Sequence, residues 1–356
     1  MAPAPQASLS DKLGLLPKTG NVLLAVSTTM LTRPFISSSK PLDLFRDVAF
    51  TAMRSFLSNV NTPLEQWMTN TTEAEYLAAA KKLKYTPDTE VLTSGLKVHR
   101  LGAEDAEHTI LFFHGGGYNL GAGAGHLIWL HDLVEDLSKQ KSVNVVLPSY
   151  TLAPQGQYPL QLQQATEVLQ WLVSTKGKSP SKIIIAGDSA GGNLALALIS
   201  HILHPHPSVP KLELKEPLAA ALLISPWVTF VPDDECVRRN QRSDLVTPVA
   251  AKRWSSNFMG STPTDNYTQP LDADSTWFSG LDNIAKDVLI YGGGGEILID
   301  SIKSFAHKLQ QAHPRVEVVV QPRVGHDDVI LDKVFGYEGR TEGTRVMEDW
   351  VEKRMV

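Results

Sequence analysis

The run from residue 182 to residue 192 decides the fold, and it reads Lys-Ile-Ile-Ile-Ala-Gly-Asp-Ser-Ala-Gly-Gly. Its first half is a short β-branched run, typical of a strand that is covered on both faces. Its second half is a G-x-S-x-G motif centred on Ser189. Between a strand and a helix, this motif forms a sharp turn that pushes the serine hydroxyl outward. We expect the strand to end at Ala186, the helix to begin just past Ser189, and Ser189 to be a nucleophile.

The glycines of this run also fit a helix start that binds phosphate. A phosphate-binding loop carries a lysine directly after its last glycine, and this run has none. The strand that precedes the motif and the helix that follows it favour a nucleophile. We therefore interpret Gly187 to Gly192 as a nucleophile elbow, with Asp188 as a supporting residue.

A second glycine-rich run, His-Gly-Gly-Gly at 114–117, follows the apolar strand predicted over 108–113. Attack by a serine places negative charge on the carbonyl oxygen, and preset N–H groups stabilise that charge. Glycines allow the backbone to approach the oxygen closely. We interpret His114 as a residue that orders this loop and not as the catalytic base. The donors that we expect are the N–H groups of Gly116, Gly117 and Ala190.

The base and the acid are expected after the last two strands, in the chain order Ser, acid, His. His326 follows the strand predicted over 316–321, where a loop meets the carboxyl edge of the sheet. Glu296 follows the strand predicted over 288–291, and Asp300 lies one helical turn further along. We expect His326 to be the base and Glu296, in preference to Asp300, to be the acid that orients it.

Strand and helix patterns alternate from about residue 89, which predicts a mostly parallel sheet with helices on both faces. Residues 1–88 are predicted to be a helical segment, with one helix capped by Thr72 and Glu75. Residues 89–356 would form the catalytic domain, and an insertion at about 230–285 would lie over the carboxyl edge and complete a cap. The predicted strands are 89–101 (one or two strands), 108–113, 143–147, 182–186, 218–224, 288–291 and 316–321.

The composition excludes several classes of protein. The chain has 356 residues, is 42% hydrophobic and 20% charged, and carries a net charge of −5 without a basic block. Nucleic acid is therefore excluded as a partner. We expect no metal and no cofactor, because the His, Cys and carboxylate spacings match no ligand pattern and the glycine runs lack the acidic partner of a dinucleotide fingerprint.

One cysteine, Cys236, rules out an intrachain disulfide, and we interpret it as a small buried residue and not as a nucleophile. The apolar stretch 21–31 is too short to span a membrane and is not a secretory signal. We therefore expect a cytoplasmic protein. Contact of residues 21–35 with a membrane, and formation of a homodimer, stay open.

The chain resembles the hormone-sensitive-lipase-like branch of the α/β-hydrolases over residues 90–335. The resemblance rests on the two glycine motifs, on Tyr150-Thr-Leu-Ala-Pro154 with Tyr158-Pro159, and on Glu296-Ile-Leu-Ile-Asp300. It implies an α/β-hydrolase fold with an N-terminal cap. Thr151 stands where the family usually has Arg, Ile297 where it has Pro, and Glu296 where Asp is commoner. Some relatives that lack the histidine are hormone receptors, but His326 is present here.

These patterns favour a serine carboxylesterase or deacetylase that forms an acyl-enzyme. Apolar residues in the predicted cap indicate a moderately hydrophobic small-molecule ester as substrate; they are Phe35, Phe45, Trp254 and Phe258. Two alternatives remain open at this stage. One is an acyltransferase or cyclising thioesterase of natural-product biosynthesis that uses the same acyl-enzyme, and the other is a non-catalytic ligand-binding protein on the hydrolase fold.

Overall fold

The chain was analysed as a computed structural model, which describes residues 6–35, 40–337 and 340–356. Within these residues one sheet of eight strands has the order β1-β2-β4-β3-β5-β6-β7-β8. β2 is antiparallel to both of its neighbours, and all other pairs are parallel. The strands are β1 Asp88–Val91, β2 Lys97–Gly102, β3 His108–Phe113, β4 Val143–Pro148, β5 Ile183–Asp188, β6 Ala220–Ile224, β7 Val288–Gly293 and β8 Val316–Gln321.

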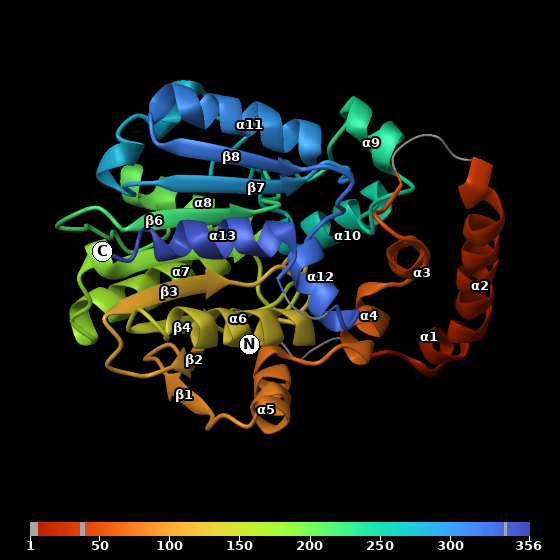
Figure 1. Cartoon of the computed structure of the whole chain (residues 1–356), viewed down its shortest axis with the longest axis horizontal. Coiled ribbons are helices and arrows are strands. Elements are labelled where there is room, and N and C mark those ends of the chain that lie inside the picture. Colours follow the sequence, from red (N-terminus) through yellow and green to blue (C-terminus); the bar gives the residue numbers. More distant parts are fainter. Residues whose placement is uncertain (1–5, 36–39, 338–339) are drawn as a thin grey trace.

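Helices cover both faces of the sheet (Figure 1). One face packs against α7 (Leu160–Gln170), α8 (Ser189–Leu203) and α11 (Ile299–Ala312). The other face packs against α6 (Ala124–Leu137) and α13 (Glu342–Glu352). Successive side chains of a strand alternate between the two layers, so Ile185 lies in the first core and Ile184 in the second. The Ile-Ile-Ile run is apolar throughout because both of its faces are buried.

The remaining helices lie mainly at the carboxyl edge of the strands or beside it (Figure 1). They are α1 Leu9–Leu13, α2 Leu15–Thr32, α3 Leu44–Asn59, α4 Thr62–Met68, α5 Thr72–Leu83, α9 Glu235–Asn240, α10 Pro248–Met259 and α12 Asp328–Val334. The short 3₁₀ turns are η1 Arg33–Phe35, η3 Pro180–Lys182, η4 Ser275–Phe278 and η5 Leu281–Asn283, and η2 Trp171–Thr175 is a π turn that ends α7.

Three of these helices, α3, α4 and α10, are joined by hydrogen bonds, and we call them the cap. Arg253 of α10 donates to the carbonyl of Leu57 in α3 and forms an ion pair with Glu65 in α4. The cap therefore combines helices of the N-terminal segment with a helix of the stretch that begins near residue 230. Residues 1–5 and 36–39 of the predicted segment 1–88 lie outside the described residues, and its boundary at residue 88 stays a prediction.

Helix α2 carries an exposed apolar face, which is made up of Leu16, Leu23, Leu24, Met30 and Leu31. None of the helices in the described part of the chain is both long enough and apolar enough to cross a membrane. Contact of this face with a membrane surface stays a prediction.

Two local predictions were wrong. β5 continues to Asp188 and α8 begins at Ser189 itself, because Gly187 and Asp188 still pair with β6. Helix α5 is capped by Thr71, whose hydroxyl accepts a hydrogen bond from the Ala74 N–H, and not by Thr72. The Thr72 hydroxyl instead contacts the imidazole of His114, a long-range contact that a local capping pattern does not reveal.

Candidate active site

Ser189 lies at a strained turn between β5 and α8. Its φ is +50°, in the left-handed region that non-glycine residues rarely adopt. The turn closes because Gly187 and Gly191 have no side chains. A Cβ on Gly191 would lie 1.9 Å from the carbonyl oxygen of Phe113, and one on Gly187 would lie 2.4 Å from that of Gly191. These glycines let α8 start directly against the ends of β3 and β5.

The structure brings the three predicted side chains together at the carboxyl edge of the sheet. The Nε2 atom of His326 lies 2.8 Å from the Ser189 hydroxyl oxygen. The Nδ1 atom of the same ring lies 2.9 Å from Oε2 of Glu296. All three side chains are buried, with Glu296 fully so. The result is a continuous chain of hydrogen bonds from a carboxylate through an imidazole to a hydroxyl.

Glu296, and not Asp300, faces the imidazole. The second carboxylate oxygen of Glu296 accepts hydrogen bonds from the Ser225 hydroxyl, at 2.6 Å, and from the backbone N–H of Gly293. Asp300 points elsewhere, because its carboxylate accepts from the backbone N–H of Cys236 and pairs with Arg239 in α9. The two carboxylates therefore have different partners, and only that of Glu296 is bonded to the imidazole.

The loop at 114–120, which we call the glycine loop, lies beside Ser189. Gly115 donates its N–H to Asp188 at 2.8 Å, and a Cβ on Gly115 would lie 2.2 Å from the other oxygen of that carboxylate. That oxygen also lies 3.0 Å from Nε2 of His126. Asp188, predicted as a supporting residue, therefore connects the glycine loop to the end of the strand that precedes Ser189.

His114 lies behind the loop and not beside Ser189. Burial lowers the pKa of its imidazole to about 4, so the ring is neutral. Its Nε2 lies 3.0 Å from the Thr72 hydroxyl, and its Nδ1 lies 2.8 Å from the Gly115 carbonyl oxygen. A carbonyl oxygen can only accept, so Nδ1 carries the proton of the neutral ring and donates to the Gly115 carbonyl, and Nε2 accepts from the Thr72 hydroxyl, whose oxygen accepts from the Ala122 N–H. This contact fixes the peptide that carries the Gly116 N–H.

The carbonyl of Gly116 accepts hydrogen bonds from the N–H groups of Asn119 and Leu120, both at 2.9 Å. Because a peptide unit is planar, fixing this carbonyl also fixes the direction of the Gly117 N–H. Ala190 lies in the first turn of α8, where N–H groups have no partner within the helix. In the described part of the chain, the N–H groups of Gly116, Gly117 and Ala190 have no hydrogen-bond acceptor.

Comparison with known proteins gives the family. A family model described as the alpha/beta hydrolase fold matches residues 110–329, more than half of the chain. The chain belongs to the α/β-hydrolase fold family. The protein LipR of Mycobacterium tuberculosis, named as an acetyl-hydrolase, is 31% identical over 65% of this chain and 70% of its own. An esterase of Acinetobacter venetianus is 29% identical over 63% and 68%.

A solved structure of an esterase from the bacterial hormone-sensitive lipase family has the same fold, with a TM-score of 0.64. It is 21% identical to this hydrolase, and the match covers 87% of this chain and 98% of the other. The predicted resemblance to hormone-sensitive-lipase-like esterases is therefore confirmed, and so is the predicted class, a carboxylic-ester hydrolase.

Two acidic residues near the hydrolase's imidazole were missed by the sequence analysis. Asp244, from the insertion, accepts a 2.7 Å hydrogen bond from the Ile297 N–H with one carboxylate oxygen and a 3.3 Å hydrogen bond from the His326 N–H with the other. It therefore connects the loop that carries Glu296 to the loop that carries His326. Burial raises the pKa of Asp244 to about 6. No local pattern marks this role, because Ile297 and His326 lie 53 and 82 positions away in the sequence.

Asp327, the second of these residues, follows His326 directly and has a φ of +53°. This backbone conformation turns its carboxylate back toward the imidazole, 3.1 Å from Nε2. Burial lowers the pKa of His326, but the charge of Asp327 and the hydrogen bonds from Asp327 and Glu296 outweigh it and raise the pKa well above its usual value. The sequence does show an aspartate directly after the predicted base, but it does not show that the side chain of this aspartate turns back toward the imidazole.

Cys236 of the hydrolase is buried and its thiol contacts the carbonyl of Ile297 at 3.0 Å. Burial raises its pKa to about 11, so the thiol stays protonated at neutral pH. These features fit the predicted packing role. No group of three His, Cys, Asp or Glu side chains that could hold a metal ion occurs in residues 6–35, 40–337 and 340–356.

A cavity of about 400 Å³ opens onto Ser189 and His326. Its apolar lining comes mostly from the cap and from α12, and its larger apolar side chains are Met53, Leu57, Met68, Leu120, Leu245, Val246, Trp254, Ile330 and Leu331. Of the four aromatic residues expected to face the substrate, Trp254 alone is in this lining. Phe35 and Phe45 are exposed, and Phe258 stacks on Tyr118 at a centroid distance of 3.8 Å. That expectation was wrong for three residues, because Phe258 packs against Tyr118 inside the fold and Phe35 and Phe45 lie on the surface, away from this lining.

Proposed function

We propose that this carboxylic-ester hydrolase works through an acyl-enzyme on Ser189, with His326 as general base and Glu296 as the acid that orients it. The observation that carries the proposal is the pair of hydrogen bonds on the His326 ring, 2.8 Å to Ser189 and 2.9 Å to Glu296. This is the arrangement by which a hydroxyl is deprotonated as it attacks a carbonyl.

In the first half of the proposed reaction, the Ser189 oxygen bonds to the ester carbonyl carbon and its proton passes to Nε2 of His326. The carbonyl oxygen becomes negative and lies against the N–H groups of Gly116, Gly117 and Ala190. When the carbon–oxygen bond of the ester breaks, His326 returns the proton to the alcohol. Water then repeats both steps on the acyl-enzyme, which releases the acid and restores Ser189.

The cavity supports a moderately hydrophobic ester as substrate. Its lining is mainly apolar, and among the described residues neither Lys nor Arg contributes to it, whereas Glu75, Asp188 and Asp327 do. An anionic ester would therefore meet carboxylates without a lysine or arginine to bind its negative charge. We propose a short acyl group on a larger, uncharged apolar alcohol, in line with relatives that are named as acetyl-hydrolase and esterase.

A panel of p-nitrophenyl esters from acetate to laurate tests this proposal. We expect kcat/KM to be highest for the short acyl chains and to fall for longer ones, with one equivalent of p-nitrophenyl phosphonate abolishing activity. Mass spectrometry of the inhibited protein should place the phosphonyl group on Ser189. Absence of turnover across the panel would favour a ligand-binding protein, and a product ester formed when an alcohol is added would favour an acyltransferase.

The carboxylate of Asp327 should set the pH at which the hydrolase becomes active. His326 accepts a proton only when it is neutral, so kcat/KM should rise as pH increases through the raised pKa of His326. Asp327→Asn removes one negative charge 3.1 Å from Nε2. We expect kcat/KM of this variant to begin rising at a lower pH than that of the unaltered chain. The largest gain relative to the unaltered chain should appear at pH values where the unaltered His326 is still protonated.

The pH profile of kcat/KM between pH 5 and pH 10 measures this effect. The other carboxylates that face His326 are Glu296, from the loop after β7, and Asp244, from the insertion; Asp188 lies close to Asp327. A matched control is Asp349→Asn, on an exposed part of α13. The proposed effect of Asp327 on His326 would be contradicted if the acidic limb of Asp327→Asn lay at the same pH as in the unaltered chain. An equal shift of the limb in Asp349→Asn would also contradict it.

A further inference from the structure

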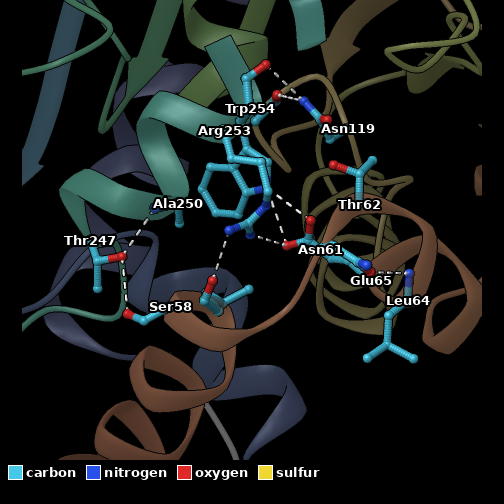
Figure 2. A network of polar contacts seen from close by, with 12 residues as sticks. Ser58, Asn61, Thr62, Leu64, Glu65, Asn119, Thr247, Ala250, Arg253 and Trp254 are labelled. Atoms are coloured by element: carbon cyan, nitrogen blue, oxygen red, sulfur yellow. Dashed lines mark hydrogen bonds and ion pairs between the residues drawn. The ribbon is translucent and has the colours of Figure 1, made fainter. Parts of the chain in front are cut away.

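Asn119 joins the glycine loop to the cap. Its side chain is fully buried, and its Nδ2 donates to the carbonyl oxygen of Gly117 at 2.7 Å and to that of Trp254 at 3.1 Å. Figure 2 shows Asn119 facing the backbone of α10 across the gap between the loop and the cap. One side chain therefore bonds both a loop residue beside the nucleophile and a helix of the insertion.

The oxygen atoms of Asn119 accept hydrogen bonds from side chains of α10 and α4. Its Oδ1 accepts from Nδ2 of Asn257 in α10, at 2.6 Å, and that nitrogen also contacts the Thr62 hydroxyl of α4, at 2.6 Å. The backbone oxygen of Asn119 accepts from the Gln66 side chain of α4, at 2.7 Å. Both parts of the cap, the N-terminal segment and the insertion, thus bind this one residue.

Trp254 of α10 forms a second link to the glycine loop. Its ring lies so close to Gly117 that a Cβ on that glycine would be 2.6 Å from the ring carbon Cδ2. The indole N–H donates to Glu65 of α4, 3.1 Å from each carboxylate oxygen. Glu65 is 1% exposed and also pairs with Arg253, at 3.3 Å (Figure 2). The ring is therefore held against the loop from the cap side.

The backbone of the glycine loop needs such support. Gly116, Gly117 and Tyr118 all have positive φ, at +99°, +59° and +61°. For Tyr118 this conformation costs free energy, and a strained backbone persists only where the surrounding structure holds it. The Asn119 side chain holds the Gly117 carbonyl, which belongs to the peptide unit that follows the Gly117 N–H, and Trp254 covers the other side of the same residue, so that the two contacts together limit rotation of the Gly117 backbone. When these contacts are absent, the loop can relax and the Gly117 N–H can turn away from the substrate oxygen.

We infer that the cap supports the oxyanion hole: Asn119, with the Glu65–Trp254 pair behind it, is a positioning residue that holds the backbone of Gly117, and through it the direction of the Gly117 N–H group, while α4 and α10 are packed against the glycine loop. This inference rests on the proposed acyl-enzyme mechanism. The cap then has two roles: it lines the cavity, and it helps to orient the N–H group that stabilises the negative oxygen of the transition state.

The variant Asn119→Ala tests this inference. It removes both Nδ2 hydrogen bonds and adds no charge. We expect kcat per active site for p-nitrophenyl acetate to fall about 30- to 100-fold with KM within threefold, because a misdirected donor loses part of the 10²- to 10³-fold effect of a deleted one. Affinity for a trifluoromethyl ketone, which forms a tetrahedral oxyanion on serine, should fall by the same factor.

Titration to its end point with p-nitrophenyl phosphonate gives the number of folded active sites, so that unfolding is not counted as lost kcat. The matched control is Asn144→Ala: Asn144 is equally buried and donates to the Ala103 carbonyl, but lies at the start of β4, at the opposite edge of the sheet. Its kcat per site should stay within twofold of that of the unaltered chain.

A second variant, Glu65→Gln, has nearly the same side-chain shape, and position 65 does not line the cavity. It weakens the hydrogen bonds that the Trp254 indole N–H donates to Glu65. We expect a three- to tenfold loss of kcat per site with KM unchanged. The inference is overturned when Asn119→Ala keeps kcat per site and ketone affinity within twofold, or when either variant changes KM alone. Failure of the unaltered chain to react with the phosphonate would instead count against the acyl-enzyme itself.

Discussion

Replacing Ser189 with alanine should lower kcat/KM for p-nitrophenyl acetate by at least about 10⁴-fold, because the variant has no hydroxyl to form the acyl-enzyme. The glycine loop and the cavity remain, so a small residual rate above that of water is expected. The backbone at position 189 is already in the left-handed region, where alanine is no more strained than serine. Stability should therefore change little, and the loss should appear in kcat.

The matched control for this substitution is Ser200→Ala in the same helix. Ser200 is fully buried and its hydroxyl accepts from the Trp277 indole, so the control also removes a buried hydroxyl. It lies eleven residues further along α8, about 16 Å at 1.5 Å per residue. We expect its kcat/KM to stay within twofold of that of the unaltered chain. A Ser189→Ala protein that still turns over the ester at a tenth of the original rate would refute the nucleophile assignment.

The parts of the fold that local sequence predicts well are those with a strong period or a fixed chain order. The Ile-Ile-Ile run of β5 is apolar because both faces are buried, and the observed strand contains this run, although it ends at Asp188 and not at Ala186. Ser189, Glu296 and His326 were found because parallel strands place their carboxyl ends at one edge, so that three loops far apart in sequence converge there. The strand order then sets how far apart these loops lie, because β5 and β7 flank β6 and β8 lies beside β7.

The residues that sequence reasoning missed act through long-range contacts. Asp244 binds backbone N–H groups from two loops, and Asn119 binds carbonyls from the glycine loop and from α10. Nothing in the residues adjacent to either one marks these partners. Thr72 was misread for the same reason: its hydroxyl contacts His114 and not the start of its own helix. Polar contacts between distant segments are specified by the folded geometry and not by a local pattern.

Glu296→Gln should lower kcat/KM by about 10³- to 10⁴-fold, although the two side chains have nearly the same shape. The reason lies in the two oxygens of the carboxylate. Oε1 accepts hydrogen bonds from the Ser225 hydroxyl and from the Gly293 backbone N–H. A backbone N–H can only donate, so in the variant the amide oxygen of the new side chain must take this place.

The amide NH₂ of the introduced glutamine then faces Nδ1 of His326, where Oε2 of the carboxylate lies at 2.9 Å in the unaltered chain. An NH₂ group donates, so Nδ1 must accept, and the proton of the neutral ring moves to Nε2. In this tautomer Nε2 cannot take the proton of Ser189. A change of tautomer of this kind lowers kcat about 10⁴-fold in a Ser-His-Asp protease. We therefore expect a loss in kcat with little change in KM.

Asp300→Asn is the comparison that decides the acid. Its carboxylate accepts from the Cys236 N–H and pairs with Arg239, and it has no contact with His326 in the described part of the chain. Loss of this partly exposed ion pair should leave kcat/KM within about threefold. Glu296→Asp, which keeps the charge but shortens the side chain, should retain more activity than Glu296→Gln, because the tautomer is preserved. If Asp300→Asn were the more damaging change, the acid would be Asp300 and the hydrogen bond from Glu296 to His326 would serve structure alone.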